Sequence, residues 1–191
     1  MALPVLRDGD VVVRPLARGD EDAWLRLREA NREWLTPWEA TLPAGVPHPT
    51  MAFAAFVRQE RRAWKKREAY AGVIVFGGQL VGRVSVGGIR WGAERGGAVG
   101  YWIAHTHAGR GITPRAVALL AKYALAQGLH RLEIAVRPEN EASLRVVEKL
   151  GFRDEGVRHS FLYIDGNWRD HRVFALVAEE PKKGLMADPA H

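Results

Sequence analysis

Between residues 98 and 136 the chain contains a strand, a loop with two glycines, a long helix and a second strand, and this unit constrains the fold more than any other feature. Residues 98–104 and 131–136 are apolar or alternating runs typical of strands. The helix is expected to begin near Ile112 and to end at Gly128. Two strands joined by a helix form a right-handed parallel crossover, so a ligand is expected at the carboxyl end of the first strand, where the loop 105–111 lies.

The rest of the pattern places antiparallel strands and shorter helices around this crossover. Proline-rich residues 34–49 and glycine-rich residues 87–97 are expected to be loops. The other expected elements are a strand at 11–13, a helix capped by Asp20, a helix capped by Thr50, strands at 69–76 and 79–86 joined by Gly77-Gly78, a helix at 140–150, and strands at 157–164 and 168–177 joined by Asp165-Gly166-Asn167. The sequence therefore predicts an α/β (α+β) fold with a mixed, mostly antiparallel sheet of about seven strands flanked by helices.

Length and composition favour one globular domain. With 191 residues, the chain is expected to form a single domain over residues 1–180, followed by a polar C-terminal tail at 181–191. No apolar run approaches the ~18 residues of a membrane span and no apolar signal core is visible, so a cytoplasmic protein without membrane contact is expected. The sequence has no cysteine, which excludes disulfides, thiolate nucleophiles and zinc–thiolate sites.

Basic residues are in excess, and most of them are arginines. The net charge is +6, and 22 of the 28 basic residues are arginine, which favours an anionic ligand or partner. The basic stretch from Arg58 to Arg67 is interpreted as a solvated helix face, and direct nucleic-acid binding is not expected. His105 and His107 lie two residues apart without a third ligand at a telling spacing, so no metal is expected.

Gly109-Arg110-Gly111 stands between the first strand of the crossover and its helix, where a phosphate could bind. The N–H groups and dipole of a helix N-terminus attract anions, glycine lets a phosphate approach the main chain, and Arg110 adds a positive charge. The pattern is not a dinucleotide-binding fingerprint, because Pro114 replaces the third glycine, and it is not a P-loop, because no Gly-Lys-Ser/Thr follows. From the residues alone, phosphate binding and an ordinary glycine turn are both open.

Several motifs, in this order, resemble the GCN5-related N-acetyltransferase (GNAT) superfamily. They are Gly100-Tyr101-Trp102-Ile103, His107-Ala108-Gly109-Arg110-Gly111-Ile112-Thr113, Asn140-Glu141-Ala142-Ser143 and Leu150-Gly151-Phe152. The segment from Asp165 to His171 resembles the RimJ/RimL branch, the ribosomal-protein-alanine N-acetyltransferases. The likeness runs from about residue 11 to 177 and implies a transferase that moves acetyl from acetyl-CoA to an amine.

The resemblance also implies which residues contact acetyl-CoA. Gly109, Arg110 and Gly111 would bind its pyrophosphate, and the backbone of Trp102 to Ala104 would pair with the pantetheine arm. The full set of candidate contacts is Trp102, Ile103, Ala104, Gly109, Arg110, Gly111, Ile112, Thr113 and Asn140. Thr106 stands where the superfamily often has Gln or Arg, which weakens one contact.

A proton donor for the departing CoA thiolate is expected at the start of the helix 140–150. Asn140 is a good N-cap, and Asn140, Ser143 and Val147 share one helix face. Val147 stands where many GNAT enzymes have a tyrosine, whereas RimL-like members resemble this chain in having serine at the position of Ser143. Ser143 is therefore the candidate catalytic acid.

The general base is less evident. Positions where relatives often carry glutamate hold residues that cannot ionise, namely Ala98, Ala135 and Leu162. Glu133 lies two residues from Ala135 and hence on the same face of its strand, so we hypothesise that Glu133 is a catalytic base acting through water. The alternative is a structural carboxylate paired with Arg131 or Arg153.

The acceptor expected is the α-amine of a protein N-terminus, for example an alanine of a ribosomal protein. An α-amine has a pKa near ~7.8 against ~10.4 for lysine, so its neutral fraction at pH 7 is on the order of 10²-fold larger and it needs less help from a base. Residues expected to line the acceptor slot, by resemblance to RimJ-like enzymes, are Trp34, Trp38, Tyr163 and Trp168. Two alternatives are a small amine such as an antibiotic, polyamine or amino acid, and a non-catalytic acyl-CoA or RNA-binding module.

Overall fold

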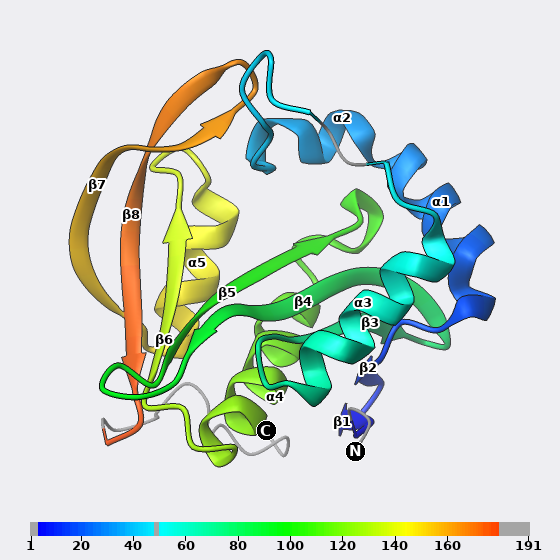
Figure 1. Ribbon diagram of the computed structural model, residues 1–191, viewed down its shortest axis with the longest axis horizontal. Helices are drawn as coiled ribbons and strands as arrows, with labels where there is room; N and C mark the ends of the chain where they lie inside the picture. Colours follow the sequence, from blue (N-terminus) through cyan, green and yellow to red (C-terminus); the bar gives the residue numbers. More distant parts are fainter. Residues whose placement is uncertain (1–3, 48–49, 180–191) are drawn as a thin grey trace.

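Eight strands form one sheet in the order β1-β2-β3-β4-β5-β6-β8-β7 within the residues that the computed structural model describes, 4–47 and 50–179 (Figure 1). Neighbouring strands are antiparallel, except that β5 and β6 run parallel. The strands are β1 (Leu6–Asp8), β2 (Val11–Arg14), β3 (Tyr70–Phe76), β4 (Gln79–Arg90), β5 (Gly96–Ile103), β6 (Arg131–Val136), β7 (Arg153–Ile164) and β8 (Asn167–Val177). The helices are η1 (Arg18–Asp20), α1 (Glu21–Ala30), α2 (Arg32–Leu35), η2 (Thr36–Trp38), α3 (Phe53–Lys65), η3 (His105–His107), α4 (Ile112–Ala126) and α5 (Glu141–Leu150).

Helices cover both faces of this sheet (Figure 1). On one face, α3 packs Phe53 and Val57 against Val73 of β3, and Trp24 of α1 joins the same apolar cluster. On the other face, α4 and α5 build the larger core, in which Leu120 is fully buried. Burying one leucine stabilises a fold by about 1.5–3 kcal/mol, so the long buried stripe of α4 fixes the crossover helix firmly against the strands.

The predicted crossover is confirmed. Strand β5 leads through η3 into α4 and back to β6, which lies parallel to β5. Gly128 follows α4 with φ of 97°, a conformation that glycine adopts without strain, and so allows the chain to turn into β6. The β3–β4 hairpin is also confirmed, with both Gly77 and Gly78 at positive φ, as the tight two-residue turn requires.

Strands β5 and β6 pair only at their beginnings and then separate. The paired residues are Gly96 to Ala98 of β5 with Arg131 to Glu133 of β6. Beyond Ala98, the edge of β5 that faces β6 has no strand partner among the described residues. The two halves of the sheet therefore diverge toward the carboxyl ends of both strands, and the loop 105–111 lies at that end.

The sheet has one strand more than the prediction of about seven, and β4, β5 and β7 extend beyond their predicted bounds. β1 pairs with β2, but a strand of three residues is too short to show alternation. The glycine-rich stretch 87–97 is mostly strand rather than loop, since β4 continues to Arg90 and β5 begins at Gly96. β7 begins at Arg153 rather than Val157, and its first residues are exposed and polar because β7 is an edge strand. A strand that buries neither face has no alternation of apolar and polar residues by which the sequence could reveal it.

Of the predicted caps of the first two helices, the position of Asp20 is confirmed and that of Thr50 is wrong. Asp20 stands at the N-cap of α1 but gives it no side-chain hydrogen bond, because its carboxylate accepts from Arg14 at 2.7 and 2.8 Å. This pairing lowers the pKa of Asp20. Thr50 does not cap α3, whose N-cap is Ala52. The expected loop 34–49 contains the end of α2 and all of η2, while Pro49 and the predicted tail 181–191 lie outside the described residues.

No helix in the described part of the chain combines the length and apolarity needed to cross a lipid bilayer.

Candidate functional site

The loop between β5 and α4 presents backbone N–H groups at a helix N-terminus. Gly109 and Gly111 have φ of 73° and 72°, the left-handed region, and Gly111 is the N-cap of α4. No side chain caps this helix, and its first turn holds no acidic residue. The first N–H groups of α4 therefore point toward an approaching anion with a favourable dipole. Ile112 is buried as an anchor for the first turn, and Thr113 is half-buried beside it.

Arg110 supplies the cationic side chain of this loop. Its guanidinium lies 5.0 Å from the ring centroid of Phe76 at the end of β3, and the ring of His107 lies 6.2 Å from the same phenyl group. In the described residues Arg110 has no acidic partner, and it is exposed. An exposed arginine held against an aromatic ring beside a helix N-terminus is suited to grip a diphosphate.

The strand before this loop offers main-chain groups to a ligand. The N–H of Ala104 donates to the carbonyl of Val81 in β4 at 2.8 Å. Because antiparallel backbone groups alternate in direction, the N–H and C=O of Ile103 point to the other edge, where β6 has separated. The Nε1 of Trp34 donates to the oxygen of Ile103 at 3.1 Å. Trp102 turns to the α1 face, its ring 5.5 Å from that of Trp24.

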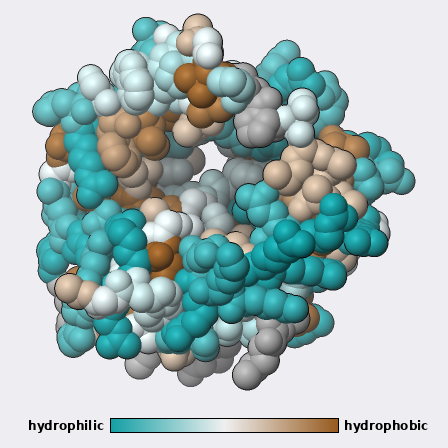
Figure 2. All heavy atoms as spheres, in the orientation of Figure 1, coloured by the Kyte–Doolittle hydropathy of each residue, from teal (hydrophilic) through white to brown (hydrophobic). Residues whose placement is uncertain are grey.

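The segment from Asn31 to Thr41, here called the strap, joins the two separated halves of the sheet. At one end, buried Asn31 accepts a hydrogen bond from the N–H of His105 at 2.8 Å. At the other end, Arg137 donates to the carbonyl of Pro37 at 2.7 Å, just beyond β6. Ala40 bridges to Ile164 of β7. Figure 2 shows an opening through the middle of the molecule, and in Figure 1 the strap, β5, β6 and α5 surround this region.

Aromatic side chains predicted to line the acceptor slot lie on the strap and on the β7–β8 hairpin. Trp34 contacts the ring of His105 at 4.5 Å, and the guanidinium of Arg137 lies 5.4 Å from the ring of Trp38. On the hairpin, the rings of Tyr163 and Trp168 meet edge to face at 5.7 Å. The N–H of Thr41 donates to the carbonyl of Tyr163 at 2.8 Å, so the structure brings both segments together.

The beginning of α5 carries the predicted acid. Asn140 caps the helix, its Oδ1 accepting from the N–H of Ser143 at 3.0 Å, as the sequence predicted. The hydroxyl of Tyr101, on β5, lies 3.5 Å from the carbonyl oxygen of Ser143. Burial raises the pKa of Tyr101 to about 12, so this phenol stays protonated at neutral pH. Val147, one turn further, is fully buried in the core.

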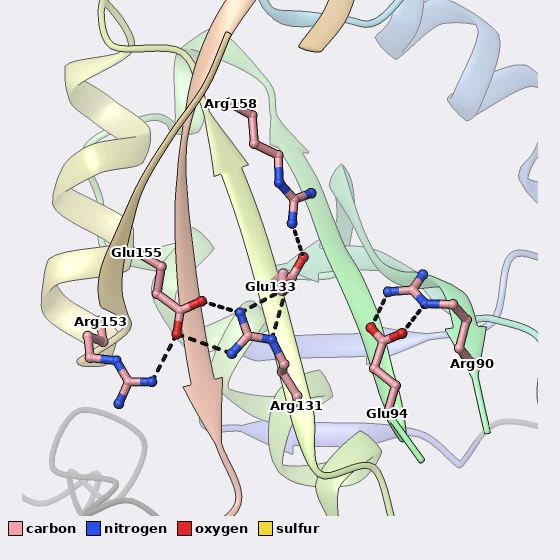
Figure 3. A network of polar contacts seen from close by, with 7 residues as sticks. All are labelled: Arg90, Glu94, Arg131, Glu133, Arg153, Glu155 and Arg158. Atoms are coloured by element: carbon pink, nitrogen blue, oxygen red, sulfur yellow. Dashed lines mark hydrogen bonds and ion pairs between the residues drawn. The ribbon is translucent and has the colours of Figure 1, made fainter. Parts of the chain in front are cut away.

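Glu133 lies in a network of arginines and glutamates (Figure 3). Its Oε1 accepts from Nε of Arg131 at 2.8 Å, and its Oε2 accepts from Arg158 at 3.2 Å. Arg131 also binds both oxygens of Glu155, which in turn accepts from Arg153 at 2.9 Å. The ion pair with Arg131 that the sequence left as an alternative is therefore formed. Both carboxylate oxygens of Glu133 therefore already accept hydrogen bonds from arginines.

Sequence reasoning missed three residues that shape this region, namely Asn31, Arg137 and His171. All three are polar, and Asn31 and Arg137 owe their positions to contacts distant in sequence, as when Asn31 holds the loop after β5. Asn31 and His171 are the two polar residues buried among the described residues, and nothing in their neighbours along the chain signals that burial.

The described residues hold no group of three or more His, Asp or Glu side chains placed to bind a metal.

This geometry agrees with the family to which the sequence is related. Residues 10–153 match the family described as acetyltransferase (GNAT) domain. The chain belongs to the GNAT acetyltransferase family. It is an acetyl-CoA-dependent N-acyltransferase of the RimJ/RimL type.

Three relatives illustrate the likeness. The probable N-acetyltransferase YjcK of Bacillus subtilis is 31% identical over 91% of this chain and 97% of its own length. The [ribosomal protein uS5]-alanine N-acetyltransferase of Escherichia coli is 28% identical, over 84% of this chain and 85% of its own. The structure of Mycobacterium smegmatis RimJ in complex with CoA-disulfide superposes with a TM-score of 0.82 at 34% identity, covering 92% of this chain and 87% of that one. The predicted GNAT identity and its RimJ/RimL branch are thereby confirmed.

Proposed function

We propose that this GNAT enzyme acetylates the α-amine of a protein N-terminus. The observation that carries the proposal is the opening closed by the strap, because such a ring admits the end of an extended chain and excludes a side chain on a folded surface. The exposed Trp168, 57% accessible, and the half-buried Tyr163 beside it offer apolar surface for the first residues of a peptide. An alanine at the N-terminus of a ribosomal protein, the acceptor named for the Escherichia coli relative, fits this class.

The same arrangement supports a distribution of roles for acetyl-CoA. Its diphosphate fits the N–H groups of Gly109 to Thr113 and the guanidinium of Arg110, and its pantetheine arm fits the unpaired edge of β5 from Trp102 to Ala104. Asn140 positions the first turn of α5 beside this edge through its cap to Ser143. Bound there, acetyl-CoA supplies a thioester as the acetyl donor. A neutral amine then attacks the thioester carbon directly, since the chain has no cysteine to carry an acetyl group.

Ser143 is the proposed proton donor to the departing thiolate. Its hydroxyl lies on the first turn of α5, where the helix N-terminus also stabilises negative charge. Tyr101 contacts the main chain of Ser143 and adds a second protonated hydroxyl at this position. Glu133 as a base acting through water is the weaker part of the proposal, because Arg131 and Arg158 occupy its oxygens.

Mass spectrometry of two matched peptides tests the acceptor. Each is incubated with acetyl-CoA and the enzyme, one with a free N-terminal alanine and no lysine, the other with a blocked N-terminus and one lysine. Acetylation of the first alone is expected. Acetylation of the lysine peptide, or of neither peptide while free polyamines or amino acids are acetylated, would refute an α-amine of a protein as the acceptor.

A further inference from the structure

One face of the sheet carries two polar groups that have no role in the function described above. Residues two apart along a strand share a face, and directly paired residues of neighbouring strands share it too. In β6 this face holds Glu133 and Ala135, and in β8 it holds Arg169, His171 and Val173, with Val173 paired to Ala135. The opposite face of the same strands packs against α4 and α5.

His171 is almost fully buried, with 3% of its surface exposed. Its Nδ1 lies 3.0 Å from the carbonyl oxygen of Arg169. A carbonyl oxygen accepts only, so Nδ1 carries the proton and the neutral ring keeps a lone pair on Nε2. Among the described residues Nε2 has no hydrogen-bond partner. Burial lowers the pKa of His171, so the ring is neutral at pH 7 and able to accept a proton there.

The strand register places His171 next to the point where β5 and β6 separate. The last β5–β6 pair joins Ala98 to Glu133, so Ala135 is the first residue of this face beyond the point of separation. His171 is the diagonal neighbour of Ala135 across β6 and β8, with their backbones about 7–8 Å apart. The strap reaches the same place, since Arg137 binds Pro37 there.

Arg169 provides an independent sign that a polar ligand belongs on this face. Its Nε is buried and has no hydrogen-bond partner in the part of the chain that the structure describes. A buried donor without an acceptor is unfavourable, and a ligand carbonyl or carboxylate would satisfy it. An unpaired donor at Arg169 and an unpaired acceptor two residues away match the C=O and the amine of a peptide N-terminal residue.

We propose that His171 is the general base of the acetyl transfer, accepting a proton at Nε2 from the attacking amine directly or through one water. The inference rests on the proposed acetylation of an amine. The amine nitrogen forms a bond to the thioester carbon and gives one proton to Nε2. The C–S bond then breaks, the carbonyl re-forms, and the thiolate takes a proton from Ser143, which regains one from solvent. His171 releases its proton to water and returns to the neutral form.

Burial, rather than the charged groups around it, keeps His171 neutral, and those groups form no hydrogen bond to Nε2 in the described residues. Arg137 and Glu139, in the segment after β6, act in opposite directions on its pKa, and Asp170 on its own strand is engaged with His159 and the N–H of Ser160. From β7, the ring of Phe161 meets His171 edge-on at 5.8 Å. Arg158, opposite in register, binds Glu133. His171 is thus the side chain of this face that is neutral and can accept a proton at pH 7.

Steady-state kinetics of His171→Asn tests the assignment. Asparagine retains an N–H for the carbonyl of Arg169 but has no basic nitrogen at the position of Nε2. With saturating acetyl-CoA and the alanine peptide, kcat is expected to fall by about 10²-fold or more, while binding of acetyl-CoA is unchanged. The wild-type kcat is expected to fall in acid as His171 is protonated, at a pH below the ordinary histidine pKa because burial lowers the pKa of this ring, and this acid limb is absent in the variant.

A control variant and a second measurement distinguish failure of the base assignment from failure of the proposed acceptor. His159→Asn, on the same hairpin but exposed, is expected to keep wild-type kcat. His171→Gln serves in place of His171→Asn where the latter fails to fold. A kcat of either His171 variant within threefold of wild type overturns the assignment while leaving the acetyl transfer intact. If the wild type acetylates a small amine and no peptide, the proposed acceptor fails, and the same kcat comparison with that amine decides for His171: a fall of about 10²-fold upholds the assignment and a kcat within threefold overturns it.

Discussion

At the scale of single residues, the two glycines before α4 determine whether the diphosphate loop can form. Gly109 and Gly111 are both left-handed, and a Cβ at either position would meet no atom within 4 Å. Gly111→Ala therefore adds backbone strain of about 1–2 kcal/mol and no steric clash. We expect KM for acetyl-CoA to rise about tenfold and unfolding to become easier by about 1 kcal/mol, measured by initial rates and urea titration. Gly19→Ala, equally open but not left-handed, should leave both quantities unchanged.

Ser143 permits a second test at this scale. Ser143→Ala removes the hydroxyl but leaves the N–H that Asn140 caps, so the helix is preserved. We expect kcat to fall about 10²-fold with KM for acetyl-CoA unchanged, because the thiolate must then take its proton from solvent. Ser85→Ala is the matched control, since Ser85 is a half-buried serine of β4 whose hydroxyl donates to the carbonyl of Gly100 at 3.4 Å. Equal kcat for wild type and Ser143→Ala would assign the proton to another donor.

At the scale of elements, the sequence predicts what periodicity and local turn chemistry determine. The buried stripe of α4, the Gly77-Gly78 hairpin and the Asn140 cap all have signals within a few residues, and all are found where expected. β1 and the first part of β7 bury little, so their pairing depends on partners distant in the chain. The loop at Gly109 could be predicted because its glycines and the helix that follows are neighbours in the sequence. The burial of Asn31 and His171 could not be predicted, because nothing in the adjacent sequence marks it.

The strap is the element whose attachment is easiest to alter. Arg137→Ala removes the hydrogen bond to Pro37 and the contact with Trp38 and leaves β6 and α5 in place. A hydrogen bond from a charged donor contributes about 1.5–3 kcal/mol, so we expect KM for the peptide acceptor to rise at least tenfold while KM for acetyl-CoA stays constant. Arg145→Ala, an exposed arginine of α5 paired with Glu141, should change neither. A larger effect on acetyl-CoA than on the acceptor would contradict a role in acceptor entry.

At the scale of the whole molecule, stability should depend on pH through carboxylates bound to arginines. Arg131 and Arg153 lower the pKa of Glu155 to about 2, and Arg172 lowers the pKa of Asp154 on the same strand. A folded pKa below the unfolded value near 4.5 gives stability that is fully present above about pH 4.5 and lost as the pH falls toward 2.

The expected result is a free energy of unfolding in urea that falls slightly below pH 6.5, where His171 is protonated more readily in the unfolded chain, and declines most between pH 4.5 and 2.5. Glu155→Gln should flatten part of that decline and remove about 1 kcal/mol or less at pH 6, because the pair is partly exposed and screened by solvent. High salt should reduce the wild-type value toward that of the variant, as expected for ion pairs near the surface. Glu141→Gln, whose carboxylate is exposed on α5, should reproduce the wild-type curve. An identical acid dependence for Glu155→Gln and wild type would mean that the network joining β6 to β7 contributes nothing to the stability of the sheet, and that the two strands are held by their backbone pairing to β8 alone.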